Sequence, residues 1–362
     1  MDENLPVIRI SVRNLVEFIL REGDIDNRTG GGQDPENMQM GSRIHRKIQR
    51  QMGSDYQAEV PLKTEIVCDG FTLKIEGRAD GLIHTKEQVM VDEIKGVLRE
   101  LDRVQEPAGI HLAQAKCYAS MVAEQEGLDE IGVQMTYCQM ETEKVKRFQY
   151  SYQSNELKVW FDEVIRQYKK WAKFQIEWRK ARNASIKGIE FPFPYRKGQR
   201  ELAVSVYRTI LRKKKLFIQA PTGVGKTIST VFPAVKAVGE ELGEKIFYLT
   251  AKTITRTVAE QAFETLREQN LKFKVITLTA KEKICFCEET SCNPDDCPYA
   301  KGHFDRVNDA VYELLMQEDV MSREVLEAQA RKHKVCPFEM ALDVSTWVDG
   351  VICDYNYVFD PD

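Results

Sequence analysis

Residues Ala220-Pro-Thr-Gly-Val-Gly-Lys-Thr227 decide the fold of the second half of this 362-residue sequence. The apolar stretch before them, residues 216–219, is expected to be a strand, and an expected helix follows them. Gly223 and Gly225 let the backbone wrap around an anion without Cβ clashes. The N–H groups at the start of the helix would then point at phosphate oxygens, so the sequence predicts a phosphate loop.

The side chains of this loop predict a site for ATP with Mg²⁺. Lys226 would reach the β- and γ-phosphates, and Thr227 would hold the magnesium ion. Thr222 and the two glycines complete the candidate ATP-binding residues within the loop. Ala220 replaces the first glycine of the usual motif, so the prediction depends on the strand before the loop and the helix after it.

The segments around the loop alternate between expected strands and helices. Two prolines stop regular structure at residues 189–194, which indicates a linker, and a helix is expected at residues 198–212. Further strands are expected at residues 246–250, 273–278 and 350–353, with helices between them. Such alternation predicts an α/β fold with a parallel sheet and helices on both of its faces.

Five of the nine cysteines crowd the region that interrupts this expected sheet. Cys285, Cys292, Cys297 and Cys336 are separated by six, four and 38 residues. An odd, clustered set in a cytosolic chain favours a metal or a cluster over disulfides. Four thiolates hold either a 4Fe–4S cluster or zinc, and the close pairs that structural zinc sites favour are missing here. Cys287 is the alternative to Cys285 as the first ligand.

The phosphate loop and the cysteine region together resemble the XPD-like helicases of superfamily 2. Phosphate loops of that family carry a small residue in place of the first glycine, as Ala220 does here. Phe193 to Gln199 resembles their upstream element, in which the glutamine contacts adenine. Residues 248–253 resemble the segment that contacts the backbone of single-stranded DNA. The Cys-Pro steps at Cys297 and Cys336 fit the four-cysteine domain that the family inserts after its phosphate loop.

This resemblance implies a RecA-like P-loop motor domain interrupted by a small, mainly helical iron–sulfur insert. It adds Gln199 to the candidate ATP-binding residues. It implies a 4Fe–4S cluster held by the four cysteines Cys285, Cys292, Cys297 and Cys336. The implied partner is DNA, single-stranded or with single-stranded tails.

Carboxylates lie on neighbouring expected strands in the first half of the sequence. Between residues 58 and 97, β-branched residues alternate with polar ones in segments that predict an antiparallel meander. Asp80 lies on one strand, and Glu93 and Lys95 share one face of the next. Two such carboxylates would bind Mg²⁺ or Mn²⁺, and the lysine would position water or stabilise developing charge. Asp92 is expected to face the other way, as a hydrogen-bonding partner.

These residues resemble the PD-(D/E)XK nuclease domain of RecB-type enzymes, which has a mixed central sheet. Gln114 and Tyr118 match the Gln-x-x-x-Tyr element of that family and share a helix face with His111. His45 matches the upstream histidine that adds a metal ligand, with a surface histidine on a basic helix as the alternative. The resemblance implies the catalytic residues Asp80, Glu93, Lys95, Gln114 and Tyr118. It implies His45, Asp80 and Glu93 as the ligands of Mg²⁺ or Mn²⁺.

Composition sets the class of protein. The apolar fraction is 43% and the charged fraction 30%, as in ordinary soluble proteins. A formal net charge of −4 argues against nucleic-acid binding through bulk positive charge, but not against a local basic groove. The acidic start, Met1 to Asn4, opens no signal peptide, and no apolar run is long enough for a membrane span. The cytoplasm is therefore the expected location.

The predicted organisation is a nuclease domain at residues 1–185, the first half of a helicase motor domain at 186–280, an iron–sulfur domain at 281–342 and a return to the motor at 343–362. In the first domain, helices are expected at residues 10–22, 108–125 and 155–182, and further strands at 131–138 and 146–152. No Asp-Glu-Ala-His box and no second motor lobe occur in the sequence, so we expect a fragment or a truncated product. The predicted function is an ATP-dependent DNA helicase and nuclease of DNA repair or recombination. The alternative is a non-cutting DNA-binding module joined to a nucleotide-binding adaptor.

Overall fold

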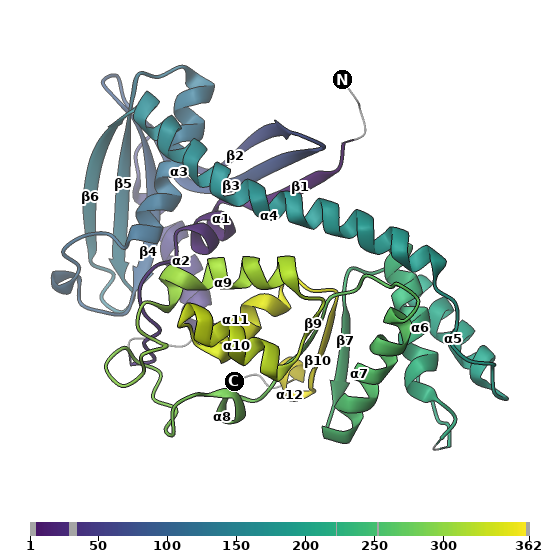
Figure 1. Ribbon diagram of the computed structural model, residues 1–362. Helices are drawn as coiled ribbons and strands as arrows, with labels where there is room; N and C mark the ends of the chain where they lie inside the picture. Colours follow the sequence, from purple (N-terminus) through teal and green to yellow (C-terminus); the bar gives the residue numbers. More distant parts are fainter. Residues whose placement is uncertain (1–4, 29–34, 222, 252, 360–362) are drawn as a thin grey trace. The chain divides into compact units, whose positions relative to one another are not determined.

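A computed structural model describes residues 5–28, 35–221, 223–251 and 253–359 of the chain (Figure 1). The chain divides into two compact units. Unit 1 contains Met1–Arg21 and Thr29–Phe174, and unit 2 contains Glu22–Arg28 and Gln175–Asp362. Within the described residues, no helix is both long enough and apolar enough to cross a bilayer.

Unit 1 is built on a mixed sheet, which is six-stranded in the described part of the chain. Its strands are β1 (Val7–Ser11), β2 (Tyr56–Cys68), β3 (Phe71–His84), β4 (Val89–Val97), β5 (Glu130–Gln139) and β6 (Val145–Gln153). They are ordered β1-β3-β4-β5-β6, and β2 also pairs with β3. The pairs β1–β3 and β4–β5 are parallel and the others are antiparallel. The expected antiparallel meander of β2, β3 and β4 and the expected mixed sheet are confirmed.

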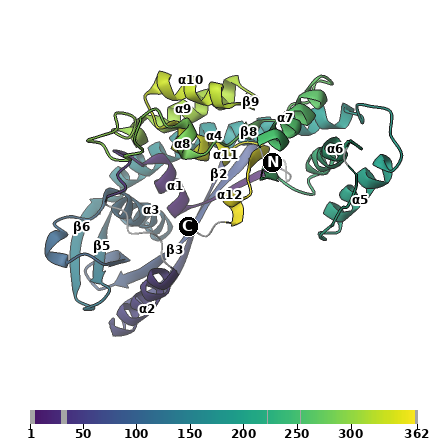
Figure 2. The same cartoon turned by 90° about the horizontal axis from the view of Figure 1, so that it is seen from below.

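Three helices lie beside this sheet (Figures 1 and 2). They are α1 (Val12–Ile19), α2 (Pro35–Gln51) and α3 (Gly109–Glu126). β5 is buried along nearly its whole length, as expected for a strand covered on both faces. The helix expected at residues 10–22 is shorter at both ends: β1 takes up residues 10 and 11, and the helix ends at Ile19. The Ser11 side chain accepts a 3.0 Å hydrogen bond from the Asn14 N–H and so fixes where α1 begins.

Unit 2 contains a parallel sheet in the order β7-β10-β8-β9. The strands are β7 (Ile246–Thr250), β8 (Val275–Thr277), β9 (Val320–Met321) and β10 (Gly350–Asp354). β10 lies between β7 and β8, with Gly350 opposite both Ile246 and Val275. The α/β class and the parallel sheet are therefore confirmed. Sequence reasoning missed β9, which comes from the cysteine-rich region and pairs with β8.

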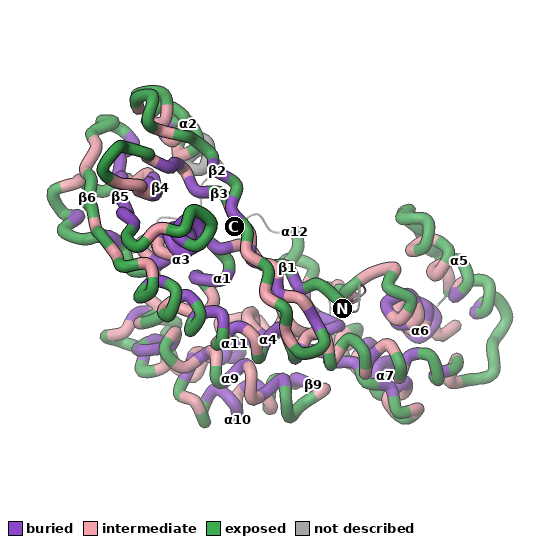
Figure 3. The backbone as a smooth tube through the Cα atoms, turned by 90° about the horizontal axis from the view of Figure 1, so that it is seen from above, coloured by how far each residue is buried: buried purple, intermediate pink, exposed green. Residues whose placement is uncertain are grey.

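The strand expected at residues 216–219 is a wrong prediction. The structure has an irregular, exposed segment there (Figure 3). The Phe217 side chain is 93% exposed. An apolar run predicts burial only if a neighbouring strand pairs with it, and no strand of the described residues does so. The segment follows helix α5 (Gln199–Leu211) after a turn in which Lys213 has a φ of 52°.

The remaining helices of unit 2 fall into two groups. Helices α6 (Lys226–Gly239) and α7 (Thr253–Arg267) contribute Val231, Val235 and Phe263 to the core beside the sheet. The cysteine-rich region is mainly helical, as expected. Its helices are α8 (Lys281–Ile284), α9 (His303–Gln317), α10 (Arg323–His333) and α11 (Pro337–Ser345), and α12 (Asn356–Phe359) ends the described chain.

Helix α4 (Ser154–Gly188) contributes to both units, and its last residues pack in unit 2. Arg182 and Asp349 form a buried ion pair with an N–O distance of 2.7 Å. The Asp349 carboxylate also accepts hydrogen bonds from the Trp178 indole and from the Lys274 backbone N–H, both at 2.8 Å. This carboxylate therefore fixes α4 against the residues at the start of β10.

Candidate functional site

The first candidate site of the chain lies on β3 and β4 of unit 1. The register places Gly81 opposite Asp92, so the preceding Asp80 lies beside Glu93. An Asp80 carboxylate oxygen accepts a 2.7 Å hydrogen bond from the Ile94 N–H, which fixes the aspartate across the two strands. Glu93 is 2% exposed, and its Oε2 has no hydrogen-bond partner among the described residues. Burial raises the pKa of Glu93 to about 7, with Lys95 opposing and Asp80 adding to the shift.

Lys95 links the carboxylates to α3. Its ammonium lies 2.9 Å from Glu93 Oε1 and 3.0 Å from Gln114 Oε1. Tyr118, one helical turn after Gln114, lies close to β3, because a Cβ added at Gly77 would stand 2.6 Å from the Tyr118 hydroxyl oxygen. Burial raises the pKa of Tyr118 to about 12. Gln114 and Tyr118, the residues expected from the Gln-x-x-x-Tyr element, therefore lie beside the carboxylates of β3 and β4.

His45 approaches the same carboxylates from α2. Its Nδ1 lies 3.2 Å from Asp80 Oδ1. Burial lowers the pKa of His45, but the hydrogen bond and negative charge of Asp80 outweigh this and raise it. α2 packs through Ile44 and Ile48 against Ile94, Cys138 and Met140. His45 is thus part of the site.

Sequence reasoning missed Gln49. Its amide donates a 2.9 Å hydrogen bond to the Asp80 backbone carbonyl. The available signal was its position four residues after His45, which places both side chains on one face of α2. Gln49 therefore holds the backbone of the aspartate that His45 contacts.

Asp92 faces away from these groups, as expected. Its carboxylate accepts hydrogen bonds from Thr136 Oγ1 at 2.6 Å, Gln134 Nε2 at 3.1 Å and the Tyr56 hydroxyl at 3.1 Å. Burial raises the pKa of Asp92, while these three donors oppose the shift. The prediction of a hydrogen-bonding role is confirmed.

The second candidate site is the phosphate loop at the start of α6. Gly223 and Gly225 have φ values of 80° and 73°, a left-handed conformation that glycine adopts without strain. The Lys226 ammonium donates to the carbonyls of Ala220 at 2.7 Å and Pro221 at 3.0 Å. Thr227 is in the first turn of α6, and Thr222 lies outside the described residues.

Arg196, which precedes α5, and Gln199, the first residue of α5, hold this loop. The Gln199 side chain is buried, donates to the Val224 carbonyl at 2.8 Å and accepts from the Arg196 N–H at 2.7 Å. The Arg196 guanidinium donates to the Gly223 carbonyl at 2.6 Å. Sequence reasoning missed Arg196, although it lies in the upstream element that contains Gln199. The Gln199 side chain therefore contacts the backbone of the phosphate loop.

Cys285, Cys287, Cys292 and Cys297 lie in the segment after α8, and Cys336 is the N-cap of α11. Cys287 Sγ lies 3.6 Å from Cys297 Sγ, and the pKa of Cys287 is raised to about 12 by burial and by the neighbouring thiols of Cys297 and Cys285. Burial raises the pKa of Cys336 to about 11, although backbone N–H groups at the start of α11 oppose it. In the part of the chain that the structure describes, no three histidine, cysteine or carboxylate residues are arranged as ligands of one metal ion.

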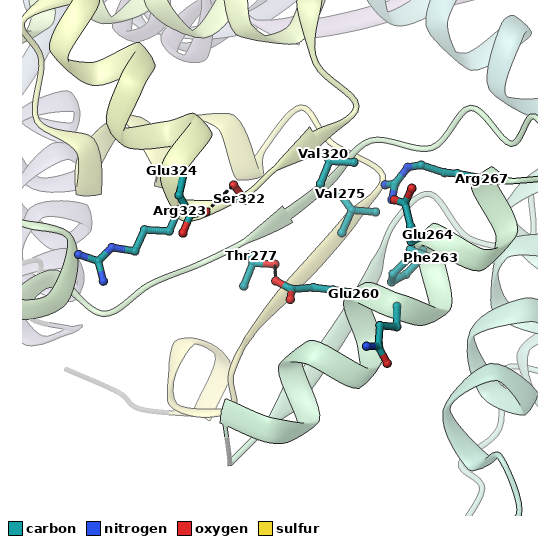
Figure 4. A pocket seen from close by; sticks show the side chains of 11 residues that line it. Glu260, Phe263, Glu264, Arg267, Val275, Thr277, Val320, Ser322, Arg323 and Glu324 are labelled. Carbon is teal, nitrogen blue, oxygen red and sulfur yellow. Dashed lines mark hydrogen bonds and ion pairs between the residues drawn. The ribbon is translucent and has the colours of Figure 1, made fainter.

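Two pockets of unit 2 lie away from the phosphate loop. One, of about 440 Å³, is bordered by α7, β8, β9 and α10, and the Thr277 hydroxyl there donates to Glu260 at 2.6 Å (Figure 4). The other, of about 640 Å³, is lined by Arg256, Lys281 and Lys283 together with Asp354 at the end of β10. Carboxyl ends of parallel strands are where α/β folds bind ligands. In the predicted DNA-contacting segment 248–253, Lys252 lies outside the described residues.

Comparison with known proteins connects this second unit to helicases. Residues 200–286 match the DEAD/DEAH box helicase family, and residues 250–362 match the DEAD_2 family. The chain is 21% identical over 224 residues to Regulator of telomere elongation helicase 1 of Homo sapiens, covering 48% of this chain and 18% of that protein. It is 31% identical over 121 residues to a probable ATP-dependent helicase of Methanocaldococcus jannaschii, covering 33% and 18%. Residues 200–362 therefore resemble the helicase domains of these two families.

The extent of these matches is limited. The chain spans less than a fifth of the length of the curated relatives named above. A solved XPD helicase structure matches with a TM-score of 0.31 and 17% identity, covering 46% of this chain and 29% of that chain.

Proposed function

We propose that this chain is part of an ATP-dependent DNA helicase that also carries a metal-dependent nuclease domain. The motor half of the proposal is supported by the helicase-family matches over residues 200–362. The nuclease half is supported by one observation above all. Glu93 is a buried carboxylate with an unpartnered oxygen, beside Asp80, His45 and the Lys95 ammonium.

The unit 1 site supplies donors of the kind that a divalent cation takes, although in the described part of the chain no three of them are arranged around one point. Oxygen ligands are those that Mg²⁺ and Mn²⁺ prefer, and a buried Glu93 oxygen without a partner has an unmet requirement that a cation satisfies. Asp80, Glu93 and His45 would hold the ion, which when bound polarises a scissile phosphate. Lys95, held between Glu93 and Gln114, would orient the attacking water and stabilise charge on the phosphate. Gln114 and Tyr118 keep the lysine and β3 in place for that role.

In the motor half, the proposed ATP site consists of Thr222, Gly223, Gly225, Lys226, Thr227 and Gln199. Lys226 would exchange the carbonyls of Ala220 and Pro221 for phosphate oxygens. Thr227 would hold the Mg²⁺ that accompanies ATP. Arg196 and Gln199 would keep the loop in its glycine-dependent conformation. DNA, single-stranded or with single-stranded tails, is the proposed substrate, and DNA repair or recombination the proposed setting.

The cysteine region would hold a 4Fe–4S cluster as a structural group. Four thiols in a short segment suit such a cluster, and backbone N–H groups directed at Cys336 favour its thiolate form. Cys285, Cys292, Cys297 and Cys336 are the proposed ligands. The 3.6 Å approach of Cys287 to Cys297 keeps Cys287 as the alternative first ligand. Iron analysis of anaerobically purified Cys285→Ser and Cys287→Ser variants separates the two, because only loss of a true ligand lowers the iron content.

The test of the nuclease is DNA degradation by the full chain with Mn²⁺. Glu93→Gln is expected to reduce cleavage by at least about 10³-fold, since it removes the negative charge that the metal ion and the Lys95 ammonium both face. The matched control is Glu65→Ala on β2, whose carboxylate is 53% exposed and remote from Asp80 in the register. Equal activity in the wild type and Glu93→Gln would refute the nuclease.

A second function is favoured by one specific observation. Asp80 is already paired with His45, and Glu93 with Lys95, so the carboxylates are compensated within the protein itself. Unit 1 would then be a DNA-binding module that does not cut. Calorimetry distinguishes the two functions. A module that does not cut would bind DNA, but it would not bind Mn²⁺ through Asp80.

A further inference from the structure

Three side chains of helix α3 each meet a different strand of the unit 1 sheet. Tyr118 lies close to β3, and Gln114 contacts Lys95 of β4. One turn earlier, the Nδ1 atom of His111 lies 3.0 Å from the hydroxyl oxygen of Tyr137 on β5. His111 therefore has a specific polar contact beside the site, although the proposed cleavage reaction assigns it no task.

The contact with Tyr137 fixes which ring nitrogen of His111 carries the proton. Tyr137 is fully buried, and its hydroxyl oxygen accepts a 3.1 Å hydrogen bond from the Ala108 N–H. The hydroxyl hydrogen also needs an acceptor, because a buried donor without one is costly. Among the described residues, His111 Nδ1 is that acceptor. In the neutral ring the proton then resides on Nε2.

The surroundings of His111 keep its ring neutral and favour an anionic partner. Burial is the largest cause that lowers the pKa of His111 to about 4. The other causes are the positive charges of Lys95, Arg99 and Arg13. With Nδ1 engaged by the tyrosine and a proton on Nε2, the neutral ring has no lone pair left for a metal ion. It offers one N–H group, and the nearby cations favour an acceptor with negative charge.

We propose that His111 is a substrate-binding residue whose Nε2–H donates to a phosphate oxygen of the nucleic acid, next to the phosphate that is cut. This role rests on the proposed nuclease function and extends it beyond the metal ligands. The strand β5 lies two strand spacings, roughly 10 Å, from the β3 strand that carries Asp80. Tyr137 is paired with Lys95 in the register, so His111 lies one strand beyond the lysine. The ring is half-buried, and no described residue accepts a hydrogen bond from Nε2.

The first test compares two amides at position 111 in DNA cleavage by the full chain with Mn²⁺. In His111→Asn, the amide oxygen takes the place of Nδ1, so the acceptor for Tyr137 is kept and the Nε2–H is lost. In His111→Gln, the amide nitrogen reaches the place of Nε2 and keeps the donor. The KM for DNA is expected to rise about tenfold or more in His111→Asn, because a hydrogen bond to a charged acceptor is lost. Its kcat, and both constants of His111→Gln, are expected to stay within about threefold of wild type.

A merely structural role for His111 predicts the opposite order of the two variants. The acceptor for Tyr137 would then be what matters, so His111→Asn would resemble the wild type and His111→Gln would be impaired. That order, or an unchanged KM in His111→Asn, would overturn the proposal. The matched control is His84→Gln, at a histidine of β3 whose side chain is 43% exposed.

Nitrogen NMR of the wild-type chain with isotope-labelled histidine separates this proposal from the nuclease itself. The chain has five histidines, and the resonance that His111→Gln lacks is that of His111. With EDTA present, the free chain is expected to show the Nε2–H form of His111, and saturation with a thymidine oligonucleotide is expected to shift its Nε2 resonance. A chain that passes this test but does not cut DNA loses only the nuclease. The Nδ1–H form, or an unmoved resonance in a chain that cuts DNA, refutes the role of His111 alone.

Discussion

The site on β3 and β4 and the phosphate loop differ in how much of their geometry folding has fixed. Asp80 and Glu93 lie on paired strands, and the backbone of Ile94 and the side chain of Lys95 hold them. The phosphate loop follows an exposed segment outside the sheet, and its lysine is bound to carbonyls of its own loop. A site whose residues lie on paired strands is preorganised by the sheet, whereas a loop needs its ligand or further partners to define it.

The largest expected effect concerns the buried Arg182–Asp349 ion pair of unit 2, which lies at the start of β10 and not at the carboxyl ends of the strands. Asp349→Ala leaves Arg182 buried without its partner and is expected to reduce the free energy of unfolding by about 3–5 kcal/mol. Denaturant unfolding followed by tryptophan fluorescence measures this. Glu268→Ala, at an exposed carboxylate on the same unit, is expected to stay within about 0.5 kcal/mol of wild type. If Asp349→Ala reduced the free energy of unfolding as little as the control variant does, this result would contradict the buried ion pair.

Lys95→Ala tests whether the unit 1 site is preorganised for catalysis. Cleavage of DNA with Mn²⁺ is expected to fall by about 10²-fold to 10³-fold, because the ammonium that stabilises developing charge is gone. Mn²⁺ binding by calorimetry is expected to persist, since Asp80 and Glu93 remain. Lys63→Ala, at an exposed lysine of β2, serves as the control. Parallel loss of metal binding and cleavage would instead assign Lys95 a structural role.

Lys226→Ala tests the phosphate loop. Binding of a fluorescent ATP analogue with Mg²⁺ is expected to weaken by about 10-fold to 100-fold, because one charged hydrogen-bond donor to phosphate is lost. The change is smaller than for Lys95, since the wild-type lysine must first leave two carbonyls. The exposed Lys215 supplies the control variant Lys215→Ala. Unaltered affinity in Lys226→Ala would place the nucleotide elsewhere.

The smallest expected effect is on the hydrogen bonds behind the unit 1 site. Tyr56→Phe removes one of three donors to Asp92 and is expected to lower the free energy of unfolding by about 1 kcal/mol. Cleavage is expected to stay within a few-fold of wild type, because Asp92 faces away from Glu93. A large loss of activity at unchanged stability would show that Asp92 acts in the site after all.

Short-range patterns in the sequence determined most of the elements and the composition of both sites. Alternation placed Glu93 and Lys95 on one face and Asp92 on the other, because side chains of a strand point to opposite faces in turn. Helical spacing placed Gln114 and Tyr118 together, since residues four apart share a helix face. The glycines of the phosphate loop carried their own conformational signal, which the φ values of Gly223 and Gly225 match.

Only the tertiary structure decided what depends on partners distant in the sequence. The apolar run at 216–219 predicts a strand. However, a strand forms only where another strand pairs with it, and no strand in the described residues pairs with this run. The roles of Gln49 and Arg196 follow from backbone carbonyls that approach from other elements. Likewise, nothing local in residues 22–28 indicates that they bind the cysteine region, because their partners lie more than 260 residues away along the chain. Local patterns report a residue's own conformational preference, whereas such contacts depend on how distant segments fold together.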